Sequence, residues 1–190
     1  SDFLSLSPIK PLEFDKFGCS ISNGTPAIMY RVWEMIGSLL VPDNKCRAIF
    51  LLQGEPSSGK SILGKIISRL FDSKYVSNLN MSQLGNNAAA KALIDKQLNI
   101  SLDLPNDVIP PAAISFLKQM TGGDLNSSSI DENSNNTFGH CKFLFATNHP
   151  LTIKGVDTAF AERIVCIPFF KSIPKQMHDS NLYEKLEKEL

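Results

Sequence analysis

The stretch Gly54-Glu55-Pro56-Ser57-Ser58-Gly59-Lys60-Ser61 fits the phosphate-binding loop pattern G-x-x-x-x-G-K-[ST] at every fixed position. The two glycines permit a tight turn whose backbone N–H groups point inward and attract anions. Lys60 is placed to reach the β- and γ-phosphates of a nucleotide, and the Ser61 hydroxyl to ligate Mg²⁺. The stretch therefore predicts a nucleotide site at residues 54–61, with ATP and Mg²⁺ as its cofactors.

The sequence on both sides of this loop supports the prediction. Residues 47–53 form a short apolar run that is typical of a buried parallel strand. Residues 61–71 have apolar positions at helical spacing, so we expect a helix that turns the positive end of its dipole towards the phosphates. A chance match on a surface turn is the alternative, and the strand before and the helix after argue against it.

Composition limits the other classes of protein. The 190 residues favour one domain, and 43% of them are hydrophobic, enough for a sizeable core. The 19 basic and 19 acidic residues cancel, so any contact with nucleic acid must be local. The four cysteines form no C-x-x-C pair, which predicts reduced and mostly buried thiols. No apolar run is long enough to span a bilayer, so we expect no membrane partner, and the reduced thiols are typical of a cytoplasmic protein.

Strand-like and helix-like segments alternate around the loop. Strands are expected at 74–79, 97–102, 141–146 and 164–168, and helices from Pro26, at 88–94, at 111–122, at 158–163 and from Asp179. This alternation predicts an α/β fold, a three-layer core with a mainly parallel sheet flanked by helices. We divide the chain into an irregular lead-in at 1–24, a core at 25–176, and a C-terminal helix at 177–190 that marks the truncated edge of a longer protein.

Three polar residues occupy positions that suit hydrolysis of a nucleoside triphosphate. Asp103 follows an apolar strand, where a parallel sheet places its ligands, and it suits the carboxylate that holds Mg²⁺. Asn148 also follows a buried strand, where its amide can meet the γ-phosphate or the attacking water. Arg163 can supply positive charge to the transition state. Each has an ordinary alternative: a strand-end cap, a turn residue and a surface ion pair.

Taken together, these residues resemble the superfamily 3 helicase domain of AAA+ type, most closely the phage, plasmid and poxvirus primase-helicases. The resemblance is carried by the loop, by Asp103, by the segment Phe143-Leu144-Phe145-Ala146-Thr147-Asn148, and by Phe160-Ala161-Glu162-Arg163 with Pro168-Phe169 behind it. It implies an AAA+-like P-loop NTPase core, a homo-hexameric ring in the full-length protein, and single-stranded DNA in the ring pore. It also implies that Asn148 is the γ-phosphate sensor and that Arg163 is an arginine finger for the ATP of the neighbouring subunit.

The chain departs from that family in two places. A second acidic residue normally stands beside the metal-holding one, but Leu104 follows Asp103 and the nearest spare carboxylate is Asp107. The segment 126–139, where the family has a pore hairpin, carries no Lys or Arg, which leaves Phe138 and His140 as its candidate DNA contacts. We therefore predict weak DNA binding with a shallow dependence on salt concentration. Tight and steeply salt-dependent binding would instead indicate a basic surface built from Lys74, Lys91, Lys118 and Lys142.

We therefore expect an ATPase and DNA helicase core from the replication protein of a phage, plasmid, mobile element or virus. The resemblance implies that it acts in the cytoplasm of a bacterial host or of a virus-infected cell. The alternative is a nucleotide-switched AAA+ assembly or remodelling ATPase that does not unwind DNA. A small-molecule kinase would also account for the phosphate loop, but it would give no role to Asn148 or Arg163.

Overall fold

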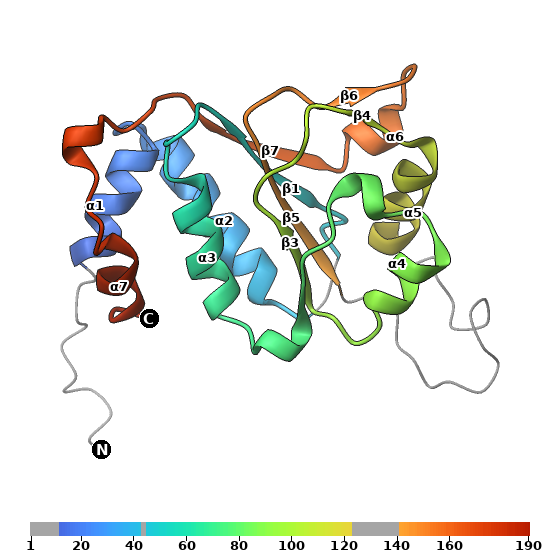
Figure 1. The fold of residues 1–190 in the computed structure, drawn as a ribbon, viewed down its shortest axis with the longest axis horizontal. Coiled ribbons are helices and arrows are strands. Elements are labelled where there is room, and N and C mark those ends of the chain that lie inside the picture. The colour runs from blue at the N-terminus through green and yellow to red at the C-terminus, as the bar shows by residue number, and fades with distance from the viewer. Residues whose placement is uncertain (1–11, 43–44, 123–140) are drawn as a thin grey trace.

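Five parallel strands form the central sheet, in the order β2-β3-β5-β1-β7 (Figure 1). Their bounds are β1 Ile49–Gly54, β2 Val76–Ser77, β3 Leu98–Ser101, β5 Lys142–Thr147 and β7 Ile164–Phe169. This computed structural model describes residues 12–42, 45–122 and 141–190. Every strand pair is parallel, and β1 lies between β5 and β7, so the predicted α/β fold with its parallel sheet is confirmed.

Helices cover both faces of this sheet (Figure 1). On one face lie α1 Leu12–Ile21, α2 Pro26–Leu40, α3 Lys60–Arg69 and α7 Leu182–Glu187. On the other lie α4 Asn87–Ala92, α5 Pro111–Gly122 and α6 Thr158–Ala161. Short 3₁₀ turns are η1 Ser73–Tyr75, η2 Met81–Gln83 and η4 Lys175–Met177, and a small parallel pair is formed by β4 Val108–Ile109 and β6 Thr152–Ile153.

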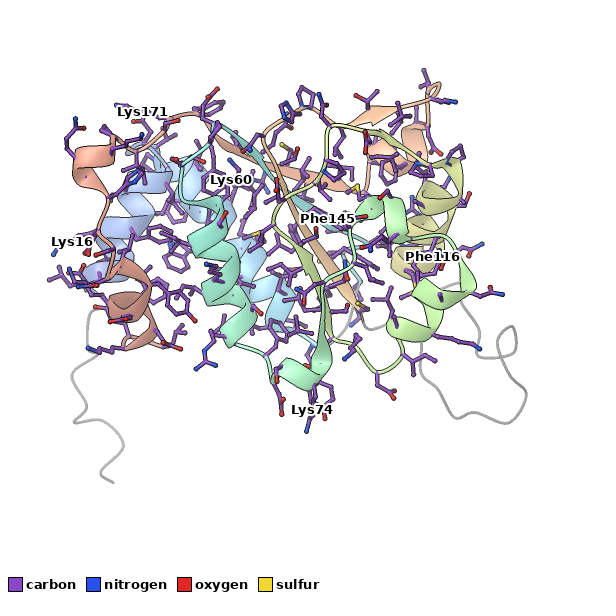
Figure 2. The ribbon with its side chains drawn as sticks, viewed as in Figure 1. Lys16, Lys60, Lys74, Phe116, Phe145 and Lys171 are labelled. Carbon is purple, nitrogen blue, oxygen red and sulfur yellow. The ribbon has the colours of Figure 1, made fainter. Side chains whose placement is uncertain are left out.

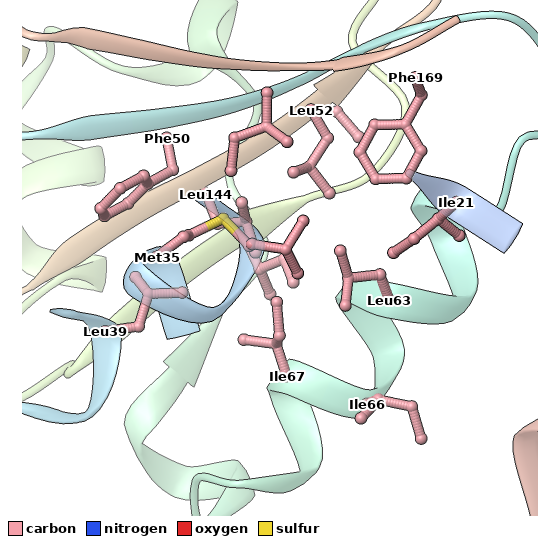
Figure 3. Close-up of a cluster of buried hydrophobic side chains, with 14 of the residues drawn as sticks. Ile21, Met35, Leu39, Phe50, Leu52, Leu63, Ile66, Ile67, Leu144 and Phe169 are labelled. Atoms are coloured by element: carbon pink, nitrogen blue, oxygen red, sulfur yellow. The ribbon is translucent and has the colours of Figure 1, made fainter. Parts of the chain in front are cut away.

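Alternate side chains of the central strands build two separate cores. In β1, Phe50 and Leu52 face the layer of α1, α2 and α3, whereas Ile49 and Leu51 face the layer of α4 and α5. Figure 3 shows the first of these cores, with Leu63 and Ile67 of α3 turned towards the strands. Figure 2 labels Phe145 of the sheet and Phe116 of α5, which both belong to the second core. Burial on both faces explains why the strand sequences are continuously apolar.

One polar residue is completely buried in the sheet. Asn99 of β3 has no exposed surface, and both ends of its amide are hydrogen-bonded. Its Oδ1 accepts hydrogen bonds from Ser77 Oγ and Leu79 N, each at 2.9 Å, and its Nδ2 donates to Leu79 O at 2.9 Å. Asn99 thereby fixes the chain that leaves the edge strand β2.

The predicted irregular lead-in at 1–24 is wrong where it can be judged, because residues 12–21 form α1. The misleading residue is Gly18. A Cβ there would lie 3.2 Å from Met29 Sδ, so this glycine permits close packing of α1 on α2 and does not break the helix. Residues 1–11 lie outside the described part. The predicted C-terminal helix at 177–190 is shorter, at residues 182–187, and is preceded by η4.

The structure also bears on two expectations drawn from composition, the burial of the cysteines and the lack of a membrane-spanning segment. Of the four cysteines only Cys141 is buried, whereas Cys19, Cys46 and Cys166 are exposed, so the prediction of mostly buried thiols is wrong. Within residues 12–42, 45–122 and 141–190, no helix has the length and apolar character needed to cross a bilayer.

Candidate nucleotide site

A cavity of about 580 Å³ lies at the carboxyl ends of the sheet strands, where β1 runs into the loop and the loop into α3. Figure 2 shows Lys60 there, at the start of α3. This is the edge at which parallel α/β sheets bind their ligands. The cavity is lined by Pro56, Ser57, Ser58, Gly59, Lys60, Ser61, Ile62, Leu102, Asp103, Asn148, Ile173, Met177, His178, Asp179, Ser180 and Leu182.

The two loop glycines are required by packing as well as by the turn. Gly54 has φ +148°, and a Cβ on it would lie 2.0 Å from the carbonyl oxygen of Phe169 in β7. Gly59 has φ +97° and is the left-handed residue before α3; its Cβ would lie 2.6 Å from Ile21 Cγ2 in α1. Strand β7 and helix α1 therefore press directly on the loop, a contact that the loop pattern alone does not predict.

The Lys60 ammonium lies inside the loop. It donates to Gly54 O at 2.8 Å, Glu55 O at 2.6 Å and Ser58 Oγ at 3.1 Å. Burial lowers the pKa of this amine, and the negative charge of Glu55 partly offsets the effect. Two backbone carbonyls and one side-chain hydroxyl of the loop thus hold the lysine ammonium in place.

Asp103 and Asn148 both line this cavity, as their positions after two strands predict. Leu104 N donates to Ala146 O at 2.9 Å, so the chain at Asp103 runs beside the end of β5. Past β5, Thr147 Oγ1 accepts from His149 N at 3.0 Å and donates to His149 O at 3.1 Å, which fixes the turn that carries Asn148. Asp103 and Asn148 are both exposed to solvent, so neither side chain is part of the hydrophobic core.

The residues present fit a magnesium ion that is shared with a triphosphate. Ser61 and Asp103 offer a hydroxyl and a carboxylate on the same cavity, and hard oxygen ligands are those that Mg²⁺ prefers. Among the described residues no three His, Cys, Asp or Glu side chains cluster as a metal cage. Asp107, the displaced-acid alternative, lines a different depression beside Pro105 and Val108.

Arg163 does not line the cavity of its own chain. It precedes β7 at the amino end of the sheet, and Ile49 N donates to its carbonyl at 2.7 Å. The five residue steps of β7 separate this end from the loop by about 17 Å. Arg163 Nη1 donates to Ala159 O at 2.5 Å, while its Nε is buried without a hydrogen-bond partner in the described structure. Its role at a neighbouring subunit's site stays a prediction.

Sequence reasoning missed one wall of the cavity. The segment 173–182, which we call the C-terminal strap, contributes Ile173, Met177, His178, Asp179, Ser180 and Leu182. The domain limit predicted at residue 176 falls inside this strap. No pattern connects such residues to a phosphate loop, because only the tertiary course of the chain after β7 brings them there.

The candidate DNA contacts differ in whether the structure describes them and in how exposed they are. Phe138 and His140 lie outside the described residues. Lys142 is 4% exposed and binds the carbonyls of Ser38, Leu39 and Val41 at the end of α2, and Lys118 pairs with Asp157 at 2.8 Å. Lys142 therefore serves the fold and cannot contribute to a basic surface. The Lys118 side chain is 31% exposed beside Asp157, and Lys74 and Lys91 are exposed, so a basic surface that includes these three stays a prediction.

A five-stranded parallel sheet with this loop at the end of β1, a strand paired on both sides, has the architecture of a P-loop NTPase core. The chain belongs to the DUF5906 family, described as a family of unknown function, whose model matches residues 52–163, more than half of the chain. The matched region opens two residues before the loop and closes at Arg163.

Solved structures share the fold at low identity. All of this chain superposes on 46% of the chain in the A form apo structure of the NrS-1 C-terminal region, with TM-score 0.64 and 14% identity. A further apo structure of that region, residues 305–718, gives TM-score 0.59 at 13% identity over 46% of its chain. The chain thus spans about half the length of the structures it matches. No curated protein matches it by sequence.

Proposed function

We propose that this chain is the ATP-hydrolysing core of a DNA helicase from a replication protein of a phage, plasmid, mobile element or virus. The observation that carries the proposal is the convergence of the phosphate loop, Asp103 and Asn148 on one cavity from three separate segments of the chain. An accidental loop match gives no reason for an acidic and an amide side chain to meet it there. The likeness to the NrS-1 C-terminal region supports the fold and is compatible with this function.

The roles follow from the chemistry of phosphoryl transfer. Lys60 and the loop N–H groups bind the phosphates, while Ser61 and Asp103 hold the Mg²⁺ that neutralises charge on the phosphate oxygens. Asn148 orients the γ-phosphate or the water that attacks it. Because Asp107 faces elsewhere, Asp103 is the strand-end carboxylate to which we assign the metal.

Arg163 completes the site only across a subunit interface. Its position at the far end of β7 excludes direct contact with the phosphates of its own chain. We propose that it reaches the ATP of the neighbouring subunit in a hexameric ring that encloses single-stranded DNA. An arginine finger of this kind is worth about 10³–10⁵ in rate.

The first test measures ATP affinity and turnover in the presence of Mg²⁺. Lys60→Ala should lose tight ATP binding, and Asp103→Asn should lose most turnover, with circular dichroism unchanged for both. Asp107→Asn is the matched control, and it should turn ATP over normally. Loss of turnover in Asp107→Asn with a silent Asp103→Asn would overturn the assignment of the metal carboxylate.

The second test addresses the ring. Arg163→Ala and Lys60→Ala subunits are each expected to be inactive, whereas their mixture should regain activity at interfaces that combine intact Lys60 with intact Arg163. Mixed oligomers without any recovery would refute a finger that acts in trans. Stimulation of the ATPase activity by single-stranded DNA would distinguish a helicase from a remodelling ATPase. The remodelling alternative is favoured by the neutral net charge and by the acidic residues Asp131 and Glu132.

A further inference from the structure

We infer that the C-terminal strap, residues 173–182, is the nucleoside-binding wall of the triphosphate site, and that Met177 and His178 hold the base and ribose. The inference rests on the proposed function. It adds the residues that select the nucleoside, which neither the loop pattern nor the family match names.

The cavity has two chemically different ends. The phosphate loop provides the backbone N–H groups and Lys60, which is the only basic side chain among the described residues that line the cavity. The strap provides apolar side chains from Ile173, Met177 and Leu182 together with the polar groups of His178 and Ser180. The strap side chains that line the cavity include no Lys or Arg, so the charged contacts that suit a polyphosphate lie at the first end. A flat apolar base with a polar ribose matches the second end.

The strap is held firmly against the loop. Ile173 N donates to Ser57 O at 3.0 Å, and Ser172 Oγ donates to Pro56 O at 2.6 Å. At its other end, Asp179 Oδ1 accepts from Asn181 N at 2.9 Å and Oδ2 pairs with Lys185 Nζ at 2.5 Å. The bonds to Ser57 and Pro56 attach the beginning of the strap to the loop, and the bonds of Asp179 fix the turn from the strap into α7.

Asp179 is the one strap residue whose charge opposes a nucleotide. Its carboxylate is committed to Lys185 and to the backbone of Asn181, and these hydrogen bonds hold its pKa below the usual range. The adjacent Lys185 charge offsets the repulsion that a bare carboxylate would exert on a triphosphate. Asp179 is therefore a positioning residue for the strap, and the direct contacts are left to its neighbours.

His178 and Met177 are the contacts best placed for the nucleoside. His178 Nε2 lies 2.9 Å from Ile173 O. A carbonyl oxygen can only accept, so Nε2 donates this bond and Nδ1 remains for a contact with a ribose hydroxyl, which can both donate and accept. Met177 is 71% exposed, although a thioether side chain gains free energy by covering a flat ring.

The experiment compares ATP with inorganic tripolyphosphate, which carries the phosphates without a nucleoside. Both are titrated calorimetrically, with Mg²⁺, into the whole 190-residue chain. For Met177→Ala/His178→Ala we expect ATP affinity to fall at least tenfold and tripolyphosphate affinity to change less than twofold. His149→Ala is the matched control, because His149 is exposed near the site and does not line the cavity; it should leave both affinities unchanged.

The outcomes separate this inference from the proposed function. Equal losses of ATP and tripolyphosphate affinity in the double variant would show that the strap only supports the loop, which overturns the nucleoside assignment. Unchanged ATP affinity would overturn it as well. In both cases Lys60→Ala still removes binding of both ligands if the nucleotide site is real. Failure of the unaltered chain to bind either ligand would refute the nucleotide site and the inference with it.

Discussion

Gly64 in α3 makes a close contact that connects the helix after the phosphate loop to the residue before Asp103. A Cβ at Gly64 would lie 2.2 Å from Leu102 Cδ2, 2.9 Å from Cδ1 and 3.1 Å from Cγ, so the whole end of the Leu102 side chain stands in its way. The backbone at Gly64 is ordinary helix, so the conflict is steric alone. We therefore predict that Gly64→Ala destabilises the protein and displaces the chain at Asp103.

The magnitude follows from two opposing effects. Overpacking costs about 2 kcal/mol, and replacing glycine by alanine inside a helix returns about 1 kcal/mol, which leaves a net loss of about 1 kcal/mol. Leu102→Ala removes half-buried methyl groups and costs about 1.5 kcal/mol. In the double variant the conflict is gone and the helical gain remains, so the coupling between the two sites should be about 2 kcal/mol in favour of the pair.

The assay is urea unfolding, followed by circular dichroism and by the fluorescence of Trp33, which packs at 6.2 Å from the Phe14 ring. Gly37→Ala in α2 is the control, because a Cβ there meets no atom within 4 Å and should stabilise by about 1 kcal/mol. Additive effects in the double variant would refute the reasoning, as would a Gly64→Ala protein that is as stabilised as Gly37→Ala. Gly64→Ala, which displaces Leu102, should bind Mg²⁺·ATP more weakly. The double variant Gly64→Ala/Leu102→Ala should bind it normally.

Two further predictions concern buried groups of the sheet. Asn99→Ala should lower the free energy of unfolding by about 3 kcal/mol, since Leu79 N and O lose their partners, whereas Asn80→Ala should cost only the cap of η2, about 1 kcal/mol; equal losses in urea unfolding would contradict this. Burial raises the pKa of the Cys141 thiol to about 12 from an ordinary 9.0, so its contribution to stability is present below pH 9 and is lost as the pH rises from 9 towards 12. Unfolding at pH 10 should show a loss of about 1 kcal/mol that Cys141→Ala lacks, and at pH 8 a thiol reagent should modify Cys19, Cys46 and Cys166 long before Cys141.

The sequence was sufficient for the sheet because its signals are local. Apolar runs identify β1, β3, β5 and β7, and the loop pattern fixes the connection from β1 to α3. The same locality places Asp103 and Asn148 correctly, since the end of a parallel strand is a defined position relative to its neighbours.

The misses arise where the deciding partner is distant along the chain. In the sequence Gly18 resembles a helix breaker, but in the structure it packs against Met29 of α2. Lys142 resembles a surface lysine, but its ammonium donates to carbonyls at the end of α2. The pair of β4 and β6 has two residues in each strand, too few for an alternating pattern to show. The C-terminal strap belongs to the same group, because hydrogen bonds to Pro56 and Ser57, far away in the sequence, hold its beginning at the cavity.

The placement of β1 between β5 and β7 has a consequence for the order of folding. Strand β1 is the first strand of the described residues, yet both of its partners follow it by about ninety residues or more. Pairings of such long sequence separation form slowly, because the closure of a large loop must precede any gain in free energy. The phosphate loop cannot be complete before β7 and the strap are in place. Glu55 N donates to Phe169 O, and Ser57 O accepts from Ile173 N. A ribosome must therefore release residues well beyond 173 before the phosphate loop can take its final shape, and until then the apolar β1 strand depends on chaperones or on rapid collapse to escape aggregation.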